Sequence, residues 1–128
     1  MINFDIGKKI KAVIEANSGL TQDLSDAKGD LKVFPLIADE GTTFPFIVYR
    51  RSGYSPRNDK DYMGEMLNVN LILAHTKYAE SLRIANELSD TLQTYSDEDI
   101  DEIRVMNLSE DWSMDTYIQH IDVLIQFR

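Results

Sequence analysis

The sequence contains no cysteine, which excludes disulfides, thiolate nucleophiles and cysteine-ligated metal or iron–sulfur centres. Its apolar stretches, such as residues 44–49, are far shorter than the roughly 20 residues that a membrane helix needs. The first nine residues lack the basic-then-apolar order of a secretory signal peptide. We therefore expect no membrane partner.

Sequence motifs typical of phosphate binding, nucleophilic catalysis or metal binding are also absent. The glycines form neither G-x-x-x-x-G-K-[ST] nor G-x-G-x-x-G, and no serine lies in a G-x-S-x-G elbow. The two histidines, His75 and His120, have no neighbour at a metal-ligand spacing. The sequence therefore predicts no catalytic residue, no cofactor and no metal. An enzyme that uses His75 or His120 is the reading that ranks last.

What is present is an ordinary globular composition with uneven charge. The 128 residues are 43% hydrophobic, which suits a single domain over 1–128. Residues 1–60 hold nine Lys or Arg and eight Asp or Glu, whereas residues 61–128 hold four and fourteen. The first half is thus at +1 and the second half at −10, which gives the net charge of −9. Such a surplus repels phosphate and argues against a general nucleic-acid binder.

Hydrophobic periodicity predicts two helices and five strands in the order α-β-β-β-α-β-β. Helical spacing recurs from Ile6 and again from Tyr78, while a period of two marks the strands. The elements are expected over 6–16, 31–38, 44–51, 66–75, 77–94, 100–108 and 117–128. Pro35 places the first strand at a sheet edge or bulge. The expected fold is α+β, with both helices on one face of a single, mostly antiparallel sheet.

A polar segment of fourteen residues, 52–65, is expected to connect the second and third strands as a long loop. Basic and aromatic side chains gather in it and at the end of the preceding strand. They are Arg50, Arg51, Tyr54, Arg57 and Lys60. These residues could hold phosphate or DNA, but the patch is small and interrupted by Asp59 and Asp61. Pairing with carboxylates of this chain or of another subunit is favoured instead.

An acidic corner follows the second helix, formed by Asp97, Glu98, Asp99, Asp101 and Glu102. It lacks the ligand spacing and the central glycine of a calcium loop. A solvated corner is expected, and its charge could meet a basic partner or a neighbouring copy.

The order of these elements resembles that of the tail-completion and tail-terminator proteins of long-tailed bacteriophages. The resemblance rests on an N-terminal amphipathic helix (6–14), on the segment Val33-Phe34-Pro35-Leu36-Ile37-Ala38 leading into Phe44-Pro45-Phe46-Ile47-Val48-Tyr49, and on the helix from Tyr78. A strand ending near His75 and a closing strand pair containing Tyr117 complete it. It extends over nearly the whole chain and depends on strands and packing, not on reactive groups.

This resemblance implies a phage or prophage origin and a subunit of a ring, typically a hexamer, on the last ring of the tail tube. The implied partners are copies of the chain, the major tail tube protein and a head-completion or connector protein. The implied location is the tail–head junction of the virion, with assembly in the host cytoplasm. DNA would pass through the ring without being specifically bound. No catalytic residue is implied.

In a head-to-tail ring two different patches meet, and the basic residues 50–60 of one copy could face the corner 97–102 of the next. Two other functions stay open at this point. One is another neck or head-completion component. The other is a small dimeric regulatory domain that binds a ligand in an apolar pocket lined partly by Tyr49, Tyr78 or Trp112.

Overall fold

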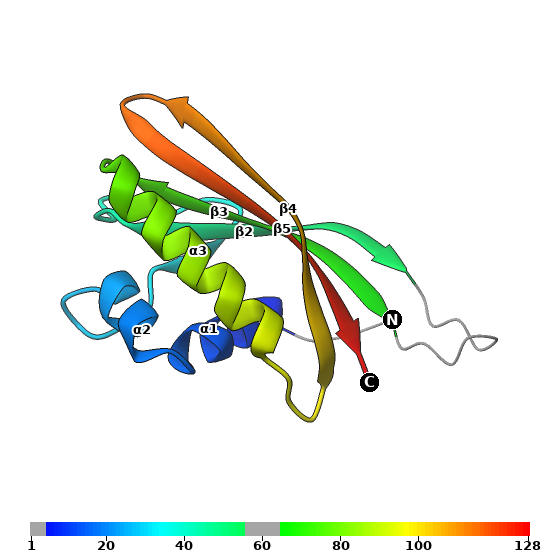
Figure 1. Cartoon of the computed structure of the whole chain (residues 1–128). Helices are drawn as coiled ribbons and strands as arrows, with labels where there is room; N and C mark the ends of the chain where they lie inside the picture. The colour runs from blue at the N-terminus through cyan, green and yellow to red at the C-terminus, as the bar shows by residue number, and fades with distance from the viewer. Residues whose placement is uncertain (1–4, 56–64) are drawn as a thin grey trace.

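A computed structural model describes residues 5–55 and 65–128. In these ranges the chain forms three helices and a five-stranded sheet (Figure 1). The helices are α1 (Ile6–Glu15), α2 (Ser18–Leu24) and α3 (Tyr78–Thr94). The strands are β1 (Val33–Pro35), β2 (Phe46–Ser55), β3 (Met66–His75), β4 (Ile100–Ser113) and β5 (Thr116–Phe127). The α+β class is confirmed, with one more helix than the sequence predicts.

The extra helix, α2, lies between the predicted elements 6–16 and 31–38, where the sequence pattern predicts neither a helix nor a strand. The Asn17 side chain accepts hydrogen bonds from the backbone N–H groups of Gly19 and Leu20, at 2.9 and 3.2 Å, and so caps the N-terminus of α2. Leu20 and Leu24, one helical turn apart, are both fully buried. Helix α1 begins at Ile6, as predicted, because the Asp5 carboxylate accepts from the N–H of Lys8 and caps the helix.

The sheet has the strand order β1-β2-β3-β5-β4, and only the β1–β2 pair is parallel. The predicted edge position of the first strand is confirmed, although β1 is only three residues long. Strand β4 forms the opposite edge. The three helices lie on one side of the sheet, as Figure 1 shows.

The core lies between the helices and one sheet face. Alternate residues of β3 and β5 point into it, as their period of two predicts. They are Leu67, Val69, Leu71, Leu73, Ile121, Val123, Ile125 and Phe127. The apolar side of α1 covers them, and Gly7 lets α1 approach Tyr49 so closely that a Cβ at this position would collide with the tyrosine hydroxyl. Burial, and then the charge of Asp5, raise the pKa of Tyr49.

Two predicted loops are shorter than expected because strands continue into them. Strand β2 runs to Ser55, four residues past the predicted strand end at Arg51, so the expected loop 52–65 is wrong at its start. The rest of that loop, residues 56–64, lies outside the described residues. Strands β4 and β5 extend into the gap between the predicted strands 100–108 and 117–128 and leave only Met114 and Asp115 between them. Both of these residues have the positive φ of a tight hairpin turn, 51° and 59°.

Candidate assembly surfaces

The basic end of β2 carries two adjacent arginines on opposite sheet faces. Arg51 pairs in register with the buried Val69 and lies on the helix-covered face, whereas Arg50 pairs with Asn70 and lies on the other. Both guanidinium groups are exposed, and neither forms an ion pair within residues 5–55 and 65–128. The remaining predicted basic residues, Arg57 and Lys60, lie outside the described part of the chain.

Tyr54 belongs to the same strand and is 40% exposed. Its hydroxyl is hydrogen-bonded to Glu65, and burial, followed by the charge of that carboxylate, raises the pKa of Tyr54. The aromatic companion of the arginines is therefore held by an acid of its own chain.

Most carboxylates of the acidic corner also have partners within the chain. The Lys9 ammonium lies 3.1 Å from Asp97 and 2.7 Å from Asp99. Asp101 pairs with Arg128 at 3.3 Å, and Glu102 pairs with Arg104 at 3.2 Å. A large part of this negative charge is therefore already neutralised where the sequence alone suggests an open acidic rim.

Asp97 is the organising residue of this corner. Its Oδ1 accepts from the backbone N–H groups of Asp99 and Ile100, at 2.8 and 2.7 Å, and its Oδ2 accepts from the Tyr95 hydroxyl at 2.8 Å. Burial opposes ionisation of Asp97, but these hydrogen bonds and that of Lys9 outweigh it and lower the pKa to about 2. The corner fixes the turn from α3 into β4.

The basic end and the acidic corner lie at the same end of the sheet but do not meet. In register, Tyr54 pairs with Leu67, Leu67 with Ile125, and Ile125 with Ile103. Two strands, β3 and β5, thus separate them within one copy. Only a contact between two copies of the chain would bring them together.

The sequence pattern did not lead us to predict a projecting hairpin arm, which we define as residues 106–120. In Figure 1 the β4–β5 hairpin extends well past the N-terminal end of α3. Its large apolar side chains are strongly exposed: Met106 59%, Leu108 53%, Trp112 58% and Met114 92%. The available signal was the absence of glycine and proline between residues 108 and 117, which favours continued strands over a loop.

A polar cluster fastens the base of the arm to α3. The buried Gln119 side-chain amide donates to Ser81 Oγ at 3.2 Å and to Glu110 Oε2 at 2.8 Å, and Glu110 accepts from the Tyr78 hydroxyl at 3.2 Å. Hydrogen bonds from Gln119 and then from Tyr78 lower the pKa of Glu110. Gln119 breaks the apolar alternation of β5 because it ties the strand to the helix.

Replacing Gln119 by leucine is expected to lower the free energy of unfolding by about 1–2 kcal/mol, because Ser81 and Glu110 both lose a donor. The same change should also speed hydrogen exchange in residues 106–120, measured by mass spectrometry. Gln126→Leu, a partly exposed glutamine on the opposite face of the same strand, is the matched control. Equal exchange in the two variants would show that the cluster does not hold the arm.

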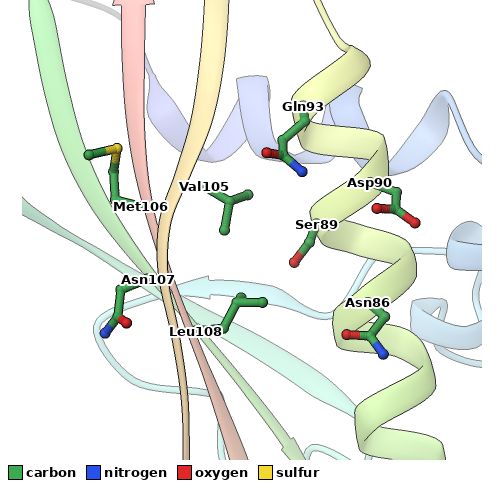
Figure 2. Close-up of a pocket in the computed structure, with 8 residues that line it drawn as sticks. All are labelled: Asn86, Ser89, Asp90, Gln93, Val105, Met106, Asn107 and Leu108. Carbon is green, nitrogen blue, oxygen red and sulfur yellow. The ribbon is translucent and has the colours of Figure 1, made fainter.

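A groove runs between α3 and β4 next to the arm. In Figure 2, Val105 and Leu108 point from β4 towards the helix, and Asn86 and Ser89 face them from α3. A second, shallow pocket beside the outer half of the arm is lined by Tyr78, Trp112 and Tyr117, whereas Tyr49 does not contribute to it. Both hollows are open and partly polar.

A second exposed apolar patch, the loop patch, follows β1 and consists of Leu36, Ile37 and Phe44. Leu36 and Ile37 are 75% and 78% exposed, and Phe44 stacks on Phe46 with ring centroids 5.4 Å apart. The buried Lys32 ammonium donates to the Thr43 carbonyl at 3.2 Å and anchors the loop. Burial lowers the pKa of Lys32. Exposed apolar patches on a small protein often mark sites of association.

The contacts of His75, one of the two histidines in the sequence, indicate a structural role. His75 Nδ1 accepts from the N–H of Thr76 at 2.9 Å at the start of α3, and burial lowers the pKa of His75. Between residues 5 and 55 and from 65 onwards, no group of three or more His, Cys, Asp or Glu is placed to hold a metal ion. No described helix is long and apolar enough to cross a bilayer.

Comparison with solved structures shows a shared fold with a chain from the virion of a native gene transfer agent particle. The TM-score is 0.71, and the match covers 92% of this chain and 90% of that chain at 11% sequence identity. No family model and no curated protein sequence matches the chain. At this identity, the likeness establishes the fold.

Proposed function

We propose that the protein is a structural component of a phage-type virion, and specifically a tail terminator. In this proposal a single domain over residues 1–128 forms a ring, a hexamer, that caps the tail tube and joins it to the head. The observation that carries the proposal is the fold shared with a virion chain over nearly the full length of both proteins.

The surface supports an assembly role. Two apolar patches are exposed, the loop patch and the arm, and β4 forms a long sheet edge with no partner among the described residues. In an isolated protein such features favour aggregation, whereas in a ring subunit they are covered by neighbours. The net charge of −9 suits a channel through which DNA passes without being held.

The proposed partners are further copies of the chain, the major tail tube protein and a head-completion or connector protein. The proposed location is the tail–head junction, after assembly in the cytoplasm of the bacterial host.

Deletion of the gene in a strain that produces the particles tests this function. Because a terminator stops polymerisation of the tube, electron microscopy should then show tubes of variable, excessive length and heads without tails. Expression of the wild-type chain in trans should restore joined particles of uniform length.

Other outcomes would contradict the proposal. Tails of normal length beside leaking or unjoined heads would place the protein on the head side of the neck. Unchanged particles would show that the protein is not a virion component. A small regulatory domain that forms a stable dimer and binds a ligand would then be the better description of its function.

A further inference from the structure

The sheet has two edges that lack a strand partner in the described part of the chain, and they lie on opposite sides of the molecule. One is the whole outer edge of β4. The other is the last part of β2: β1 pairs only with Ile47, Val48 and Tyr49, which leaves residues 50–55 without an outer neighbour among residues 5–55 and 65–128. A free edge can accept a strand from another chain.

The two edges carry opposite charge. Strand β2 contains Arg50 and Arg51 and no acid. Residues 105–127 contain no Lys or Arg, and the arm holds Glu110, Asp111 and Asp115. The faces also match: Asp111 pairs with Ile118 on the open face, as Arg50 does with Asn70, whereas Glu110 pairs with the buried Gln119 on the helix-covered face, as Arg51 does with Val69.

An antiparallel pairing that sets Arg50 opposite Asp111 also sets Arg51 opposite Glu110, so both charged pairs form in one register. Each pair then lies on a single sheet face, because residues directly opposite in a ladder point to the same side. Opposite charges across strands favour such a pairing.

The backbone groups fit the same register. Ile47 donates to the Lys32 carbonyl and the Tyr49 carbonyl accepts from Leu36, each at 2.9 Å, so the odd residues of β2 direct their backbone groups outwards and Arg51 continues this alternation. In a two-residue hairpin the residues that flank the turn bond each other. Ser113 and Asp111 thus face β5, and Glu110 presents its N–H and C=O to the free edge.

This register also brings exposed apolar residues of the two copies together. With Arg50 opposite Asp111, the ladder ends at Arg50, because β1 already occupies the outer edge of β2 from Ile47 to Tyr49. The tip of the arm therefore meets the end of β1, where the chain leaves through Leu36 and Ile37. Trp112 and Met114 at the arm tip would therefore lie beside Leu36 and Ile37. All four side chains are more than half exposed in the single chain, and their contact would remove them from water.

We propose that the arm of one copy adds to the free edge of β2 in the next copy, with Arg50 opposite Asp111 and Arg51 opposite Glu110. This interface rests on the proposed ring and names the residues that build it. Strands β2 and β4 run in opposite directions within one copy, as β2, β3, β5 and β4 are successively antiparallel. An antiparallel β4–β2 junction therefore keeps every copy in the same orientation, as a head-to-tail cyclic assembly requires.

The offset between neighbouring copies that this register produces is compatible with closure of the copies into a ring. Within one copy Arg50 aligns with Asn107, through Asn70 and Asp122. Pairing with Asp111 instead shifts the next copy by four residues across the four strands from β2 to β4. One residue of shear per strand is the ratio found in eight-stranded TIM barrels, whose strands tilt by about 36°.

Disulfide trapping in this cysteine-free chain tests the register. Arg50 and Asp111 would form a non-hydrogen-bonded pair, with Cα atoms about 4.5 Å apart, which is within disulfide range. On oxidation at high protein concentration, the double variant R50C/D111C should give a ladder of disulfide-linked oligomers on a non-reducing SDS gel. The single variants should give no species larger than a dimer. R50C/S113C, with the second cysteine two residues out of register, should cross-link at least about tenfold less.

Charge reversal provides an independent measurement. Arg50→Glu alone and Asp111→Arg alone should each raise the Kd of self-association about tenfold or more, as measured by native mass spectrometry over a concentration series. An equal mixture of the two variants should recover the wild-type assembly, because each altered edge then meets its opposite charge. Glu98→Arg, in the acidic corner, should leave the assembly unchanged.

The outcomes separate the interface from the ring. No ladder from R50C/D111C, no recovery in the mixture, or a loss of assembly in Glu98→Arg would each overturn the arm–edge pairing while a six-membered ring could persist. A ladder that closes at a number other than six would confirm the pairing and overturn the hexamer.

Discussion

Replacing Leu88 by alanine is expected to lower the free energy of unfolding by about 3 kcal/mol, the largest effect expected of any single substitution discussed. Leu88 lies on α3, is completely buried and belongs to the core between the helices and the sheet. Truncation removes its transfer free energy and leaves a cavity that rigid neighbours fill only in part. Urea denaturation, followed by far-ultraviolet circular dichroism, measures the change.

Leu82→Ala is the control for this prediction. It makes the same chemical change on the same helix, but Leu82 is 37% exposed, and we expect a loss of less than about 1 kcal/mol. Similar losses at the two positions would mean that α3 does not pack on the sheet through the face described.

Replacing Asp97 by alanine is expected to cost about 2 kcal/mol at neutral pH. The variant loses the acceptor for the Asp99 and Ile100 N–H groups and the Tyr95 hydroxyl, together with the ion pair to Lys9. Asp97→Asn keeps one oxygen acceptor and should lose less. An exposed residue of the same corner, Glu98→Gln, should be neutral within about 0.5 kcal/mol.

The Asp97 contribution should depend on pH in a defined direction. The pKa of about 2 in the folded chain is below the ordinary value of 3.8, so the unfolded chain binds the proton more readily. The stabilisation is complete above about pH 4 and is lost as the pH falls towards 2. Denaturation midpoints measured between neutral pH and pH 2 should therefore converge for wild type and Asp97→Ala. A constant gap would show that the charge of Asp97 contributes nothing.

The two most regular strands were predictable because only one of their faces is buried. Leu67, Val69 and Leu71 alternate with polar residues in β3, and Ile121 and Val123 do so in β5, and all five are buried as expected. A period of two is direct evidence of such a strand. The edge position of β1 followed from Pro35 in the same direct way.

Helix α3 was predicted in extent but not in the exact face that it buries. The apolar spacing includes Tyr78 and Leu82, yet these are 44% and 37% exposed, while Ser81 and Ser89 are buried in their place. Each serine hydroxyl donates to a carbonyl of its own helix, at 2.7 and 2.9 Å, and so tolerates burial. Hydropathy counts serine as polar and cannot anticipate this local hydrogen bond.

The candidate surfaces were the least predictable part. Charge alone pointed to Arg50 and Arg51, which are indeed exposed, but also to Asp97 and Asp99, whose partner Lys9 lies far away in sequence. The exposure of Leu36 and Ile37 could not be foreseen either, because the predicted strand 31–38 includes both, whereas β1 ends at Pro35. Tertiary contacts decide both cases.

The position of Trp112 has a practical consequence. It is the chain's single tryptophan, and it lies on the arm, 58% exposed, outside the core. Selective excitation of its indole thus reports on the arm alone, while the tyrosines and the far-ultraviolet signal report on the folded body. If a neighbouring copy covers the arm, the emission maximum should shift to shorter wavelength and quenching by iodide should fall as the protein concentration rises. The intrinsic fluorescence of Trp112 in the wild-type chain can therefore measure association without an added label.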